Sequence, residues 1–368
     1  MKKVLSILLV VALLFCFVGC GDNNANSSSQ DNSSSAQSED NTSSDTSSDT
    51  SSDNSSQTSS GTSSGTSSGT SSNTSSEQQK LEEPQFTVYT DDVYSGKLVR
   101  YELNSECKGY YFTPKAAGKY PTVIAIHGAG GVNNFKEKLL SSYNDWVKQG
   151  YIPPMVVVIP EVLPSYNPSS SGYDMQDFKY FIQNNYTKRF NTLLKSIEDG
   201  SLSPQIGTDK SICVTGFSMG GMAAIYAGAQ FPTRIKYVGG LSPSQAFYLG
   251  ENTSGGFYKK AAEIHFSDAP DAHVYMSGGK GEDGGAFITN ITRYKNAISV
   301  NNPNIAITYS APRSWGGHAW ALAQKELFMY MYFVTCGEIP SEQLVEKVCN
   351  NPDKYKVPTV VNTEEAHT

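Results

Sequence analysis

Apolar runs alternate with helical patterns along most of the chain after Lys97. Short continuous apolar runs are typical of buried strands, and apolar positions three and four residues apart are typical of helices. The predicted strands are Lys97–Leu103, Gly109–Phe112, Thr122–His127, Met155–Ile159, Ser211–Gly216, Tyr237–Leu241, His273–Ser277 and Ile305–Tyr309. The predicted helices are Lys136–Gln149, Met175–Glu198, Met219–Gln230, Phe287–Ser299 and Ala319–Val334. This alternation predicts an α/β fold with a mostly parallel central sheet of about eight strands and helices on both faces.

The order of these elements also indicates where a functional site should lie. The first two strands alternate apolar and polar positions and precede every predicted helix, so we expect an antiparallel hairpin at one edge of the sheet. In parallel sheets, ligands bind beyond the carboxyl ends of the strands. Residues that directly follow a strand are therefore the first candidates for chemistry.

The N-terminal part of the chain has a different composition. Met1–Gly19 contains two lysines followed by an apolar run, the order expected of a secretory signal peptide, with an uncleaved membrane anchor as the alternative. Phe17–Cys20 resembles a bacterial lipobox, which implies that Cys20 is lipidated and anchors the protein to the extracellular face of the cell membrane. Residues 20–80 are rich in Ser, Thr, Asn and Gly and are predicted to form a disordered tether. The folded domain is predicted over 81–355 and a flexible tail over 356–368.

Charge and cysteine content narrow the possible partners. The chain carries a net charge of −7, but Gly21–Lys80 holds eight acidic residues and one lysine, so the folded domain is close to neutral. Without a concentrated basic patch, no nucleic-acid partner is predicted. Cys336 and Cys349 could form a disulfide in an extracellular setting or remain free. No cysteine–histidine cluster has metal-ligand spacing, so no metal is predicted.

The hexapeptide Gly216–Gly221 carries the strongest chemical signal. Its G-x-S-x-G pattern is typical of the sharp strand-to-helix turn that exposes a nucleophilic serine, here Ser218. Glycine at 216 and 220 allows the backbones to approach closely in such a turn. A glycine-rich turn that merely contains a serine is the alternative, and the flanking strand and helix disfavour it.

A serine nucleophile needs a base, usually a histidine that a carboxylate orients. Of the five histidines, His318 lies in a glycine-rich loop after the last predicted strand, which makes it the predicted base. His127 introduces another glycine-rich loop and is expected to hydrogen-bond that loop. Asp283 and Glu282 both follow a strand between the serine and the histidine. We favour Asp283, because aspartate is the more frequent acid in this arrangement, and keep Glu282 as the alternative.

Two backbone N–H groups should stabilise the oxyanion that forms during acyl transfer. Met219 directly follows the serine at a predicted helix start and should supply one of them. The other is expected from the loop His127–Gly131, with Ala129 as the first choice and Gly130 as the second.

Three motifs together resemble the esterase D and feruloyl esterase group of α/β-hydrolases: Ala125–Gly131, Gly216–Gly221 and Gly316–Trp320. The resemblance covers about Tyr110–Val334. It implies the α/β-hydrolase fold and a serine esterase without a cofactor. Members of this group remove acetyl or feruloyl groups from plant polysaccharides, and relatives hydrolyse other small acyl esters or transfer acyl groups. A small ester or an acylated polysaccharide is therefore the expected substrate.

Aromatic residues near the predicted site could offer faces to a sugar or a phenolic acyl group. The candidates are Tyr166, Tyr173, Phe247, Tyr248, Trp315 and Trp320. Because the chain has 22 tyrosines, some of these rings are expected only to pack in the interior. Two alternative functions stay open: a serine peptidase or acyltransferase on the same fold, and a catalytically inactive surface binding protein.

Overall fold

The computed structural model describes residues 83–89, 96–163, 185–244, 264, 266, 271–310, 312–350 and 357–362. All of these belong to one compact unit, Ser75–Thr368. The predicted signal peptide 1–19, Cys20 and the tether 20–80 lie outside the described residues, so they stay predictions.

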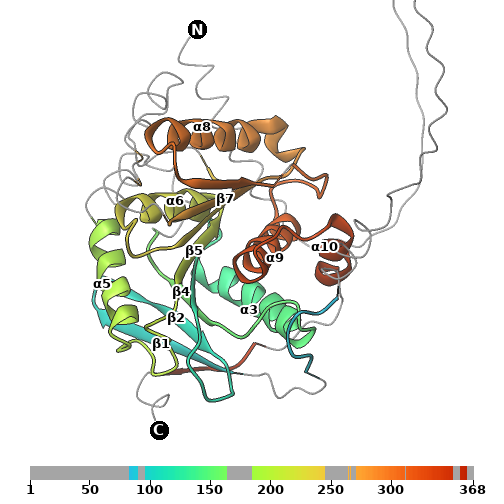
Figure 1. The fold of residues 1–368 in the computed structure, drawn as a ribbon. Helices are drawn as coiled ribbons and strands as arrows, with labels where there is room; N and C mark the ends of the chain where they lie inside the picture. The colour runs from blue at the N-terminus through green and yellow to red at the C-terminus, as the bar shows by residue number, and fades with distance from the viewer. Residues whose placement is uncertain are drawn as a thin grey trace, which may run out of the picture. The chain divides into compact units, whose positions relative to one another are not determined.

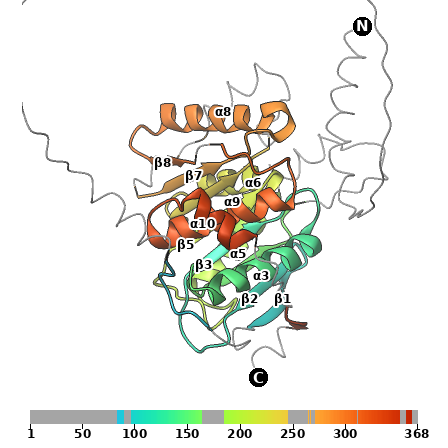
Figure 2. The same ribbon diagram turned by 90° about the vertical axis from the view of Figure 1, so that its right-hand side faces the viewer.

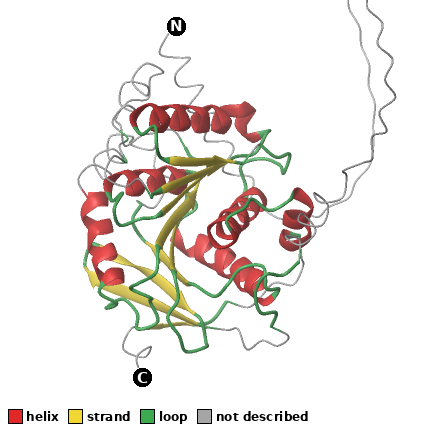
Figure 3. Ribbon diagram, in the orientation of Figure 1, coloured by secondary structure: helices red, strands yellow, loops and turns green. Residues whose placement is uncertain are grey.

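A nine-stranded sheet forms the centre of this unit, in the order β8-β7-β6-β5-β3-β4-β2-β1-β9 (Figures 1 and 3). The strands are β1 (Lys97–Asn104), β2 (Cys107–Thr113), β3 (Thr122–Ile126), β4 (Val156–Pro160), β5 (Ile212–Phe217), β6 (Tyr237–Leu241), β7 (His273–Ser277), β8 (Ala306–Tyr309) and β9 (Val360–Asn362). The neighbours from β4 through β8 pair in parallel, whereas β2 runs antiparallel to both β1 and β4. The predicted α/β fold and the parallel centre are therefore confirmed.

The ninth strand comes from the segment that the sequence predicted as a flexible tail. Val360–Asn362 pairs in parallel with Leu98–Arg100 of β1. The tail prediction over 356–368 is wrong for these residues, because their backbone groups pair with a strand edge that would otherwise be open. The antiparallel hairpin of β1 and β2 consequently lies one strand inside the edge. Composition gave no sign of this pairing, since the segment is too short to show a strand pattern.

Helices cover both faces of the sheet (Figure 2). One face carries α5 (Thr187–Glu198), α6 (Met219–Gln230) and α8 (Ala286–Asn301), and the other carries α3 (Val132–Lys148), α9 (Trp320–Cys336) and α10 (Glu342–Cys349). The sequence predicted all of these except α10, which begins after Ser341, whose side chain accepts a hydrogen bond from the Leu344 N–H.

Alternate residues of the central strands divide between the two helical layers. In β3, Ile124 and Ile126 belong to the buried cluster under α5, α6 and α8, whereas Val123 and Ala125 belong to the cluster under α3, α9 and α10. This follows from the two-residue period of strand side chains. Both faces of the central strands are thus apolar, as their continuous hydrophobic runs predicted.

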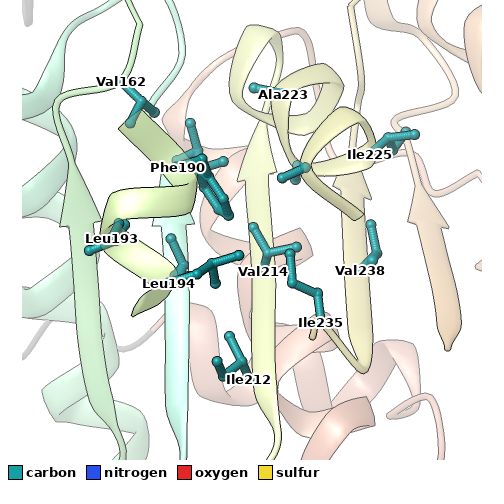
Figure 4. Packing of buried hydrophobic residues seen from close by; sticks show 14 of the residues in the cluster. Val162, Phe190, Leu193, Leu194, Ile212, Val214, Ala223, Ile225, Ile235 and Val238 are labelled. Carbon is teal, nitrogen blue, oxygen red and sulfur yellow. The ribbon is translucent and has the colours of Figure 1, made fainter. Parts of the chain in front are cut away.

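The buried cluster under α5, α6 and α8 holds the start of α6 in place. Phe190 and Leu194 of α5 belong to the same buried cluster as Ala223 of α6 and Val214 of β5 (Figure 4). Helix α6 is apolar around most of its circumference and is buried along most of its length. Its N-terminus, at the carboxyl end of β5, therefore has little freedom to move.

The described cysteines Cys107, Cys213, Cys336 and Cys349 are free thiols, so no disulfide joins Cys336 to Cys349 in the structure. Within the ranges given above, no helix combines the length and the apolar character that crossing a membrane requires.

Candidate active site

Ser218 lies in the sharp turn between β5 and α6, as the sequence predicted. Its backbone has φ 63° and ψ −121°, a conformation that residues other than glycine rarely adopt. Its N–H donates to the Leu241 carbonyl at 3.0 Å, and its own carbonyl accepts from the Met222 N–H at 3.1 Å. Neighbouring β6 and the first turn of α6 thus hold the strained serine, which is how such strain persists in a folded protein.

Two glycines make this turn possible. A Cβ atom on Gly216 would overlap the carbonyl group of Gly220, and a Cβ on Gly220 would overlap the carbonyl oxygen of Ile126 at the end of β3. The turn therefore packs directly against the end of the neighbouring strand, with no room for side chains. The G-x-S-x-G pattern reflects this close backbone contact.

The loop after β3 lies against the serine. A Cβ on Gly128 would be 3.1 Å from the Phe217 carbonyl oxygen and 4.0 Å from Ser218 Oγ. The Gly128 carbonyl accepts from the Gly131 N–H at 3.3 Å and from His127 Nδ1–H at 2.8 Å. The loop thus forms a tight turn whose central residues, Ala129 and Gly130, are the two predicted oxyanion donors.

His127 holds this turn, as expected, and is itself buried. Burial lowers its pKa, although the hydrogen bond to Gly128 acts in the opposite direction. A neutral imidazole with its proton on Nδ1 satisfies the Gly128 carbonyl and adds no charge beside the serine. The sequence had not singled out Gly128, which is the loop residue that lies closest to Ser218 in these contacts.

The structure pairs His318 with Glu282, and this corrects the preference for Asp283. His318 Nδ1–H donates to Glu282 Oε1 at 2.7 Å, and the two side chains are 4% and 0% exposed. Asp283 is the next residue, is partly exposed, and has a left-handed backbone with φ 41°. Aspartate is the more frequent acid in such sites, but the position in the loop decides which carboxylate reaches the imidazole.

The imidazole of His318 lies between two aromatic rings. Its ring centroid is 4.5 Å from that of Phe217 and 4.0 Å from that of Phe287, and both ring pairs are stacked. Phe217 directly precedes Ser218, so the stack places the histidine over the carboxyl end of β5. Neither phenylalanine was singled out from the sequence, because stacking across such separations leaves no local pattern.

The second carboxylate oxygen of Glu282 also has two donors. Oε2 accepts from Ser242 Oγ at 2.7 Å and from the Gly279 N–H at 2.6 Å. Hydrogen bonds of this kind favour the ionised carboxylate. Ser242 directly follows β6, and its position after a strand was the one available signal in the sequence.

Backbone strain is concentrated around these residues. In the described part of the chain, the residues other than glycine with positive φ are Ser218, Ser242 and Asp283. All three lie in loops that follow neighbouring strands of the parallel sheet. Such strained positions cluster at functional sites, where the surrounding structure holds them.

The predicted substrate-binding residues have different outcomes. Tyr166, Tyr173, Phe247 and Tyr248 lie outside the described residues. Trp315 is only 9% exposed and belongs to the buried cluster with α9, so it does not offer the open aromatic face predicted for it. Trp320 is partly exposed and packs edge-on against Phe135, with Lys138 Nζ 5.9 Å from its ring centroid. Its binding role stays a prediction.

The fold and this site together define an α/β-hydrolase: a mostly parallel sheet, a strained serine between β5 and α6, and a histidine in the loop after β8. The family model described as "Putative esterase" matches residues 101–330. The chain belongs to this esterase family and is a carboxylic ester hydrolase.

The chain resembles solved structures at low identity. A ferulic acid esterase from Anaeromyces mucronatus, determined in complex with ferulic acid, is 18% identical with a TM-score of 0.51, over 68% of this chain and 93% of that one. An acetyl xylan esterase from Paenibacillus sp. R4 is 13% identical with a TM-score of 0.42, over 70% of this chain and 98% of that one. The comparison with curated proteins finds no match. The first likeness describes the fold alone, and the second is too distant to carry an argument.

Proposed function

We propose that this esterase acts through a catalytic triad of Ser218, His318 and Glu282. The observation that supports this most directly is the 2.7 Å hydrogen bond between His318 and Glu282. The same imidazole stacks on Phe217, the residue before Ser218. A carboxylate on Nδ1 holds the imidazole in the tautomer that leaves Nε2 free of a proton. That nitrogen can then accept a proton from the serine.

In the proposed reaction, Ser218 Oγ attacks the ester carbonyl carbon while His318 Nε2 takes the hydroxyl proton. Glu282 stays ionised and stabilises the imidazolium. The tetrahedral intermediate collapses, and His318 returns the proton to the departing alkoxide oxygen. Water then attacks the acyl-enzyme, again with His318 as the base, and releases the carboxylic acid and free Ser218.

The oxyanion would accept hydrogen bonds from the Met219 N–H and from the Ala129 or Gly130 N–H. Met219 is the first residue of α6, where the partial positive charge of a helix N-terminus adds to the stabilisation. One such donor contributes about 10²–10³ in kcat in related chemistry. The loop beside Ser218 is already closed by its own hydrogen bonds, so these donors need little rearrangement.

Acetyl or feruloyl esters of plant polysaccharides are the proposed substrates. Membership of the esterase family and the fold shared with a ferulic acid esterase support this choice. The N-terminal segment supports a site of action outside the cell, with the domain tethered to the membrane through a lipid on Cys20. A polymeric substrate that cannot enter the cell suits such a location.

Activity assays on the full chain test the mechanism and the substrate class together. Wild type and Ser218→Ala would be compared on p-nitrophenyl acetate, methyl ferulate and acetylated xylan. We expect hydrolysis by the wild type and its loss in Ser218→Ala. Hydrolysis that survives this substitution would overturn the triad. Peptide cleavage, or acyl transfer to an alcohol in preference to water, would favour the alternative functions.

The proposed anchor has a separate test. The chain would be expressed in a bacterium fed radiolabelled palmitate, as wild type, Cys20→Ser and Cys16→Ser. Label should be lost in Cys20→Ser and kept in Cys16→Ser, a matched cysteine within the same segment. Equal labelling of the two variants would contradict lipidation at Cys20.

A further inference from the structure

A second buried carboxyl group lies behind the proposed triad. Glu326 belongs to α9 and is 1% exposed. Its Oε2 is 3.0 Å from Ser242 Oγ, and the same Oγ is 2.7 Å from Glu282 Oε2. The Ser242 hydroxyl therefore bridges two glutamates. It carries one proton and can donate to one of them, so the other contact is a hydrogen bond only if that glutamate supplies a proton.

The surroundings of the two carboxyl groups indicate which one holds a proton. Glu282 accepts from His318 Nδ1–H and from the Gly279 N–H in addition to Ser242, and this set of donors stabilises its charge. Glu326 Oε1 is buried without a well-aligned hydrogen bond to a described residue, although the Ser277 hydroxyl lies close by. A charge on Glu326 would therefore be poorly compensated.

Burial and the nearby charge also favour the protonated form of Glu326. Burial, and then the negative charge of Glu282, raise the pKa of Glu326 well above its usual range, and they outweigh the opposing effects of Ser242 and Ser277. Tyr275 of β7 lies near this group, and burial raises the pKa of its phenol, so it stays uncharged. Because both carboxyl groups contact the same Ser242 hydroxyl, ionising Glu282 and Glu326 together would be energetically unfavourable.

We propose that Glu326 is a positioning residue for the triad: as a neutral carboxylic acid it donates from Oε2 to Ser242 Oγ and thereby directs the Ser242 hydroxyl at Glu282. The inference rests on the proposed function. Glu326 then donates to Ser242 Oγ, Ser242 donates to Glu282 Oε2, and Glu282 Oε1 accepts from His318 Nδ1–H. No proton is transferred along this order. Each hydrogen bond fixes the next group, and Glu282 remains the one charged carboxyl in the pocket.

The backbone of Ser242 supports a role for its side chain. Its φ of 39° is uncommon for a residue other than glycine, and its N–H donates to the Ser277 carbonyl at 2.8 Å. The strained turn places the hydroxyl between two side chains that lie 40 and 84 residues away. A glycine would relieve the strain but remove this bridge.

Two substitutions of similar shape separate positioning from packing. Glu326→Gln keeps a donor, because its amide N–H can replace the carboxylic proton, whereas Glu326→Met fills the space without one. In the full chain, we expect Glu326→Gln to keep kcat/KM within about threefold and to leave the pH profile unchanged. Glu326→Met should lower kcat about 10- to 100-fold at nearly constant KM, the size expected when a buried polar partner is lost.

The results for the Glu326 variants test this inference independently of the proposed triad. Full activity in Glu326→Met would overturn it, as would an equal loss in Glu326→Gln or a shifted pH profile in that variant. Ser218→Ala measured beside them reports on the triad itself, so activity there would instead refute the proposed function. If the variants fail to fold, infrared spectroscopy of the wild type decides. It should show the C=O band of a neutral carboxylic acid at neutral pH, and its absence would overturn the proposal.

Discussion

The Nδ1 atom of His318 lies 2.7 Å from Oε1 of Glu282, although the two residues are 36 positions apart. The loops after β7 and β8 are joined beside them: Gly279 and Arg313 form a bridge, and the Lys280 N–H donates to the Arg313 carbonyl at 2.8 Å. The two loops are therefore hydrogen-bonded to each other close to Glu282 and His318. This contact helps to hold the two side chains together.

Glu282→Gln should lower kcat on p-nitrophenyl acetate by about 10³–10⁴-fold, because an amide no longer stabilises the imidazolium or selects its tautomer. Asp283→Asn is the matched control, one residue away with the same loss of charge. It should keep kcat within about threefold, since Asp283 is not the acid that pairs with His318. The reverse ranking would restore Asp283 as the acid.

Phe287→Ala should lower kcat by up to about tenfold, because one of the two rings stacked on the His318 imidazole is lost. Steady-state kinetics would measure the change, with circular dichroism to verify folding. Phe190→Leu serves as the control, because Phe190 packs in the α5 layer against Tyr186 and Phe231. It should reduce stability and leave kcat unchanged. A similar kcat loss in both would indicate a general packing defect.

Gly220→Ala should disrupt the serine turn, because the new methyl group would overlap the Ile126 carbonyl oxygen. Such overpacking costs about 1–3 kcal/mol of unfolding free energy. A displaced nucleophile should also lose about 10²-fold in kcat. Urea denaturation and ester hydrolysis would be measured beside Gly281→Ala, where the added Cβ meets no atom within 4 Å. Equal effects at both glycines would argue against a tight turn.

Glu326→Gln should stabilise the protein at neutral pH more than at acidic pH. In the wild type, the raised pKa keeps Glu326 protonated when folded, whereas the unfolded chain ionises it above about pH 4.3. Wild-type stability is therefore lost as pH rises from that value toward the folded-state pKa, and Gln removes this loss. The gain should grow by at most about 1.4 kcal/mol per pH unit.

Denaturant unfolding between pH 5 and pH 8 would measure this gain. The control is Glu137→Gln, at a side chain that is 67% exposed, where the difference from wild type should not grow with pH. A gain of constant size across the range in Glu326→Gln would mean that Glu326 is ionised in the folded protein.

The features that the sequence predicted well are those encoded locally. Strands β3 to β8 appear where continuous apolar runs occur, since burial on both faces requires such runs. The turn at Ser218 was identifiable because only glycine fits at 216 and 220. The loop from His127 to Gly131 was predicted to lie at the site because it directly follows a strand. The short strand β9 was missed because its pairing with β1, and not its composition, makes it a strand.

By itself, then, the sequence determined the α/β fold and the turn at Ser218, because apolar periodicity and glycine positions are encoded over a few residues. It also predicted His318 as the proposed base, from its glycine-rich loop after a strand. Only the tertiary structure decided that Glu282 rather than Asp283 meets His318, that Trp315 is buried, and that Ser242 links Glu282 to Glu326. These outcomes depend on how loops at the carboxyl ends of several strands converge. The convergence is set by packing between segments that are distant in the chain, which no local pattern records.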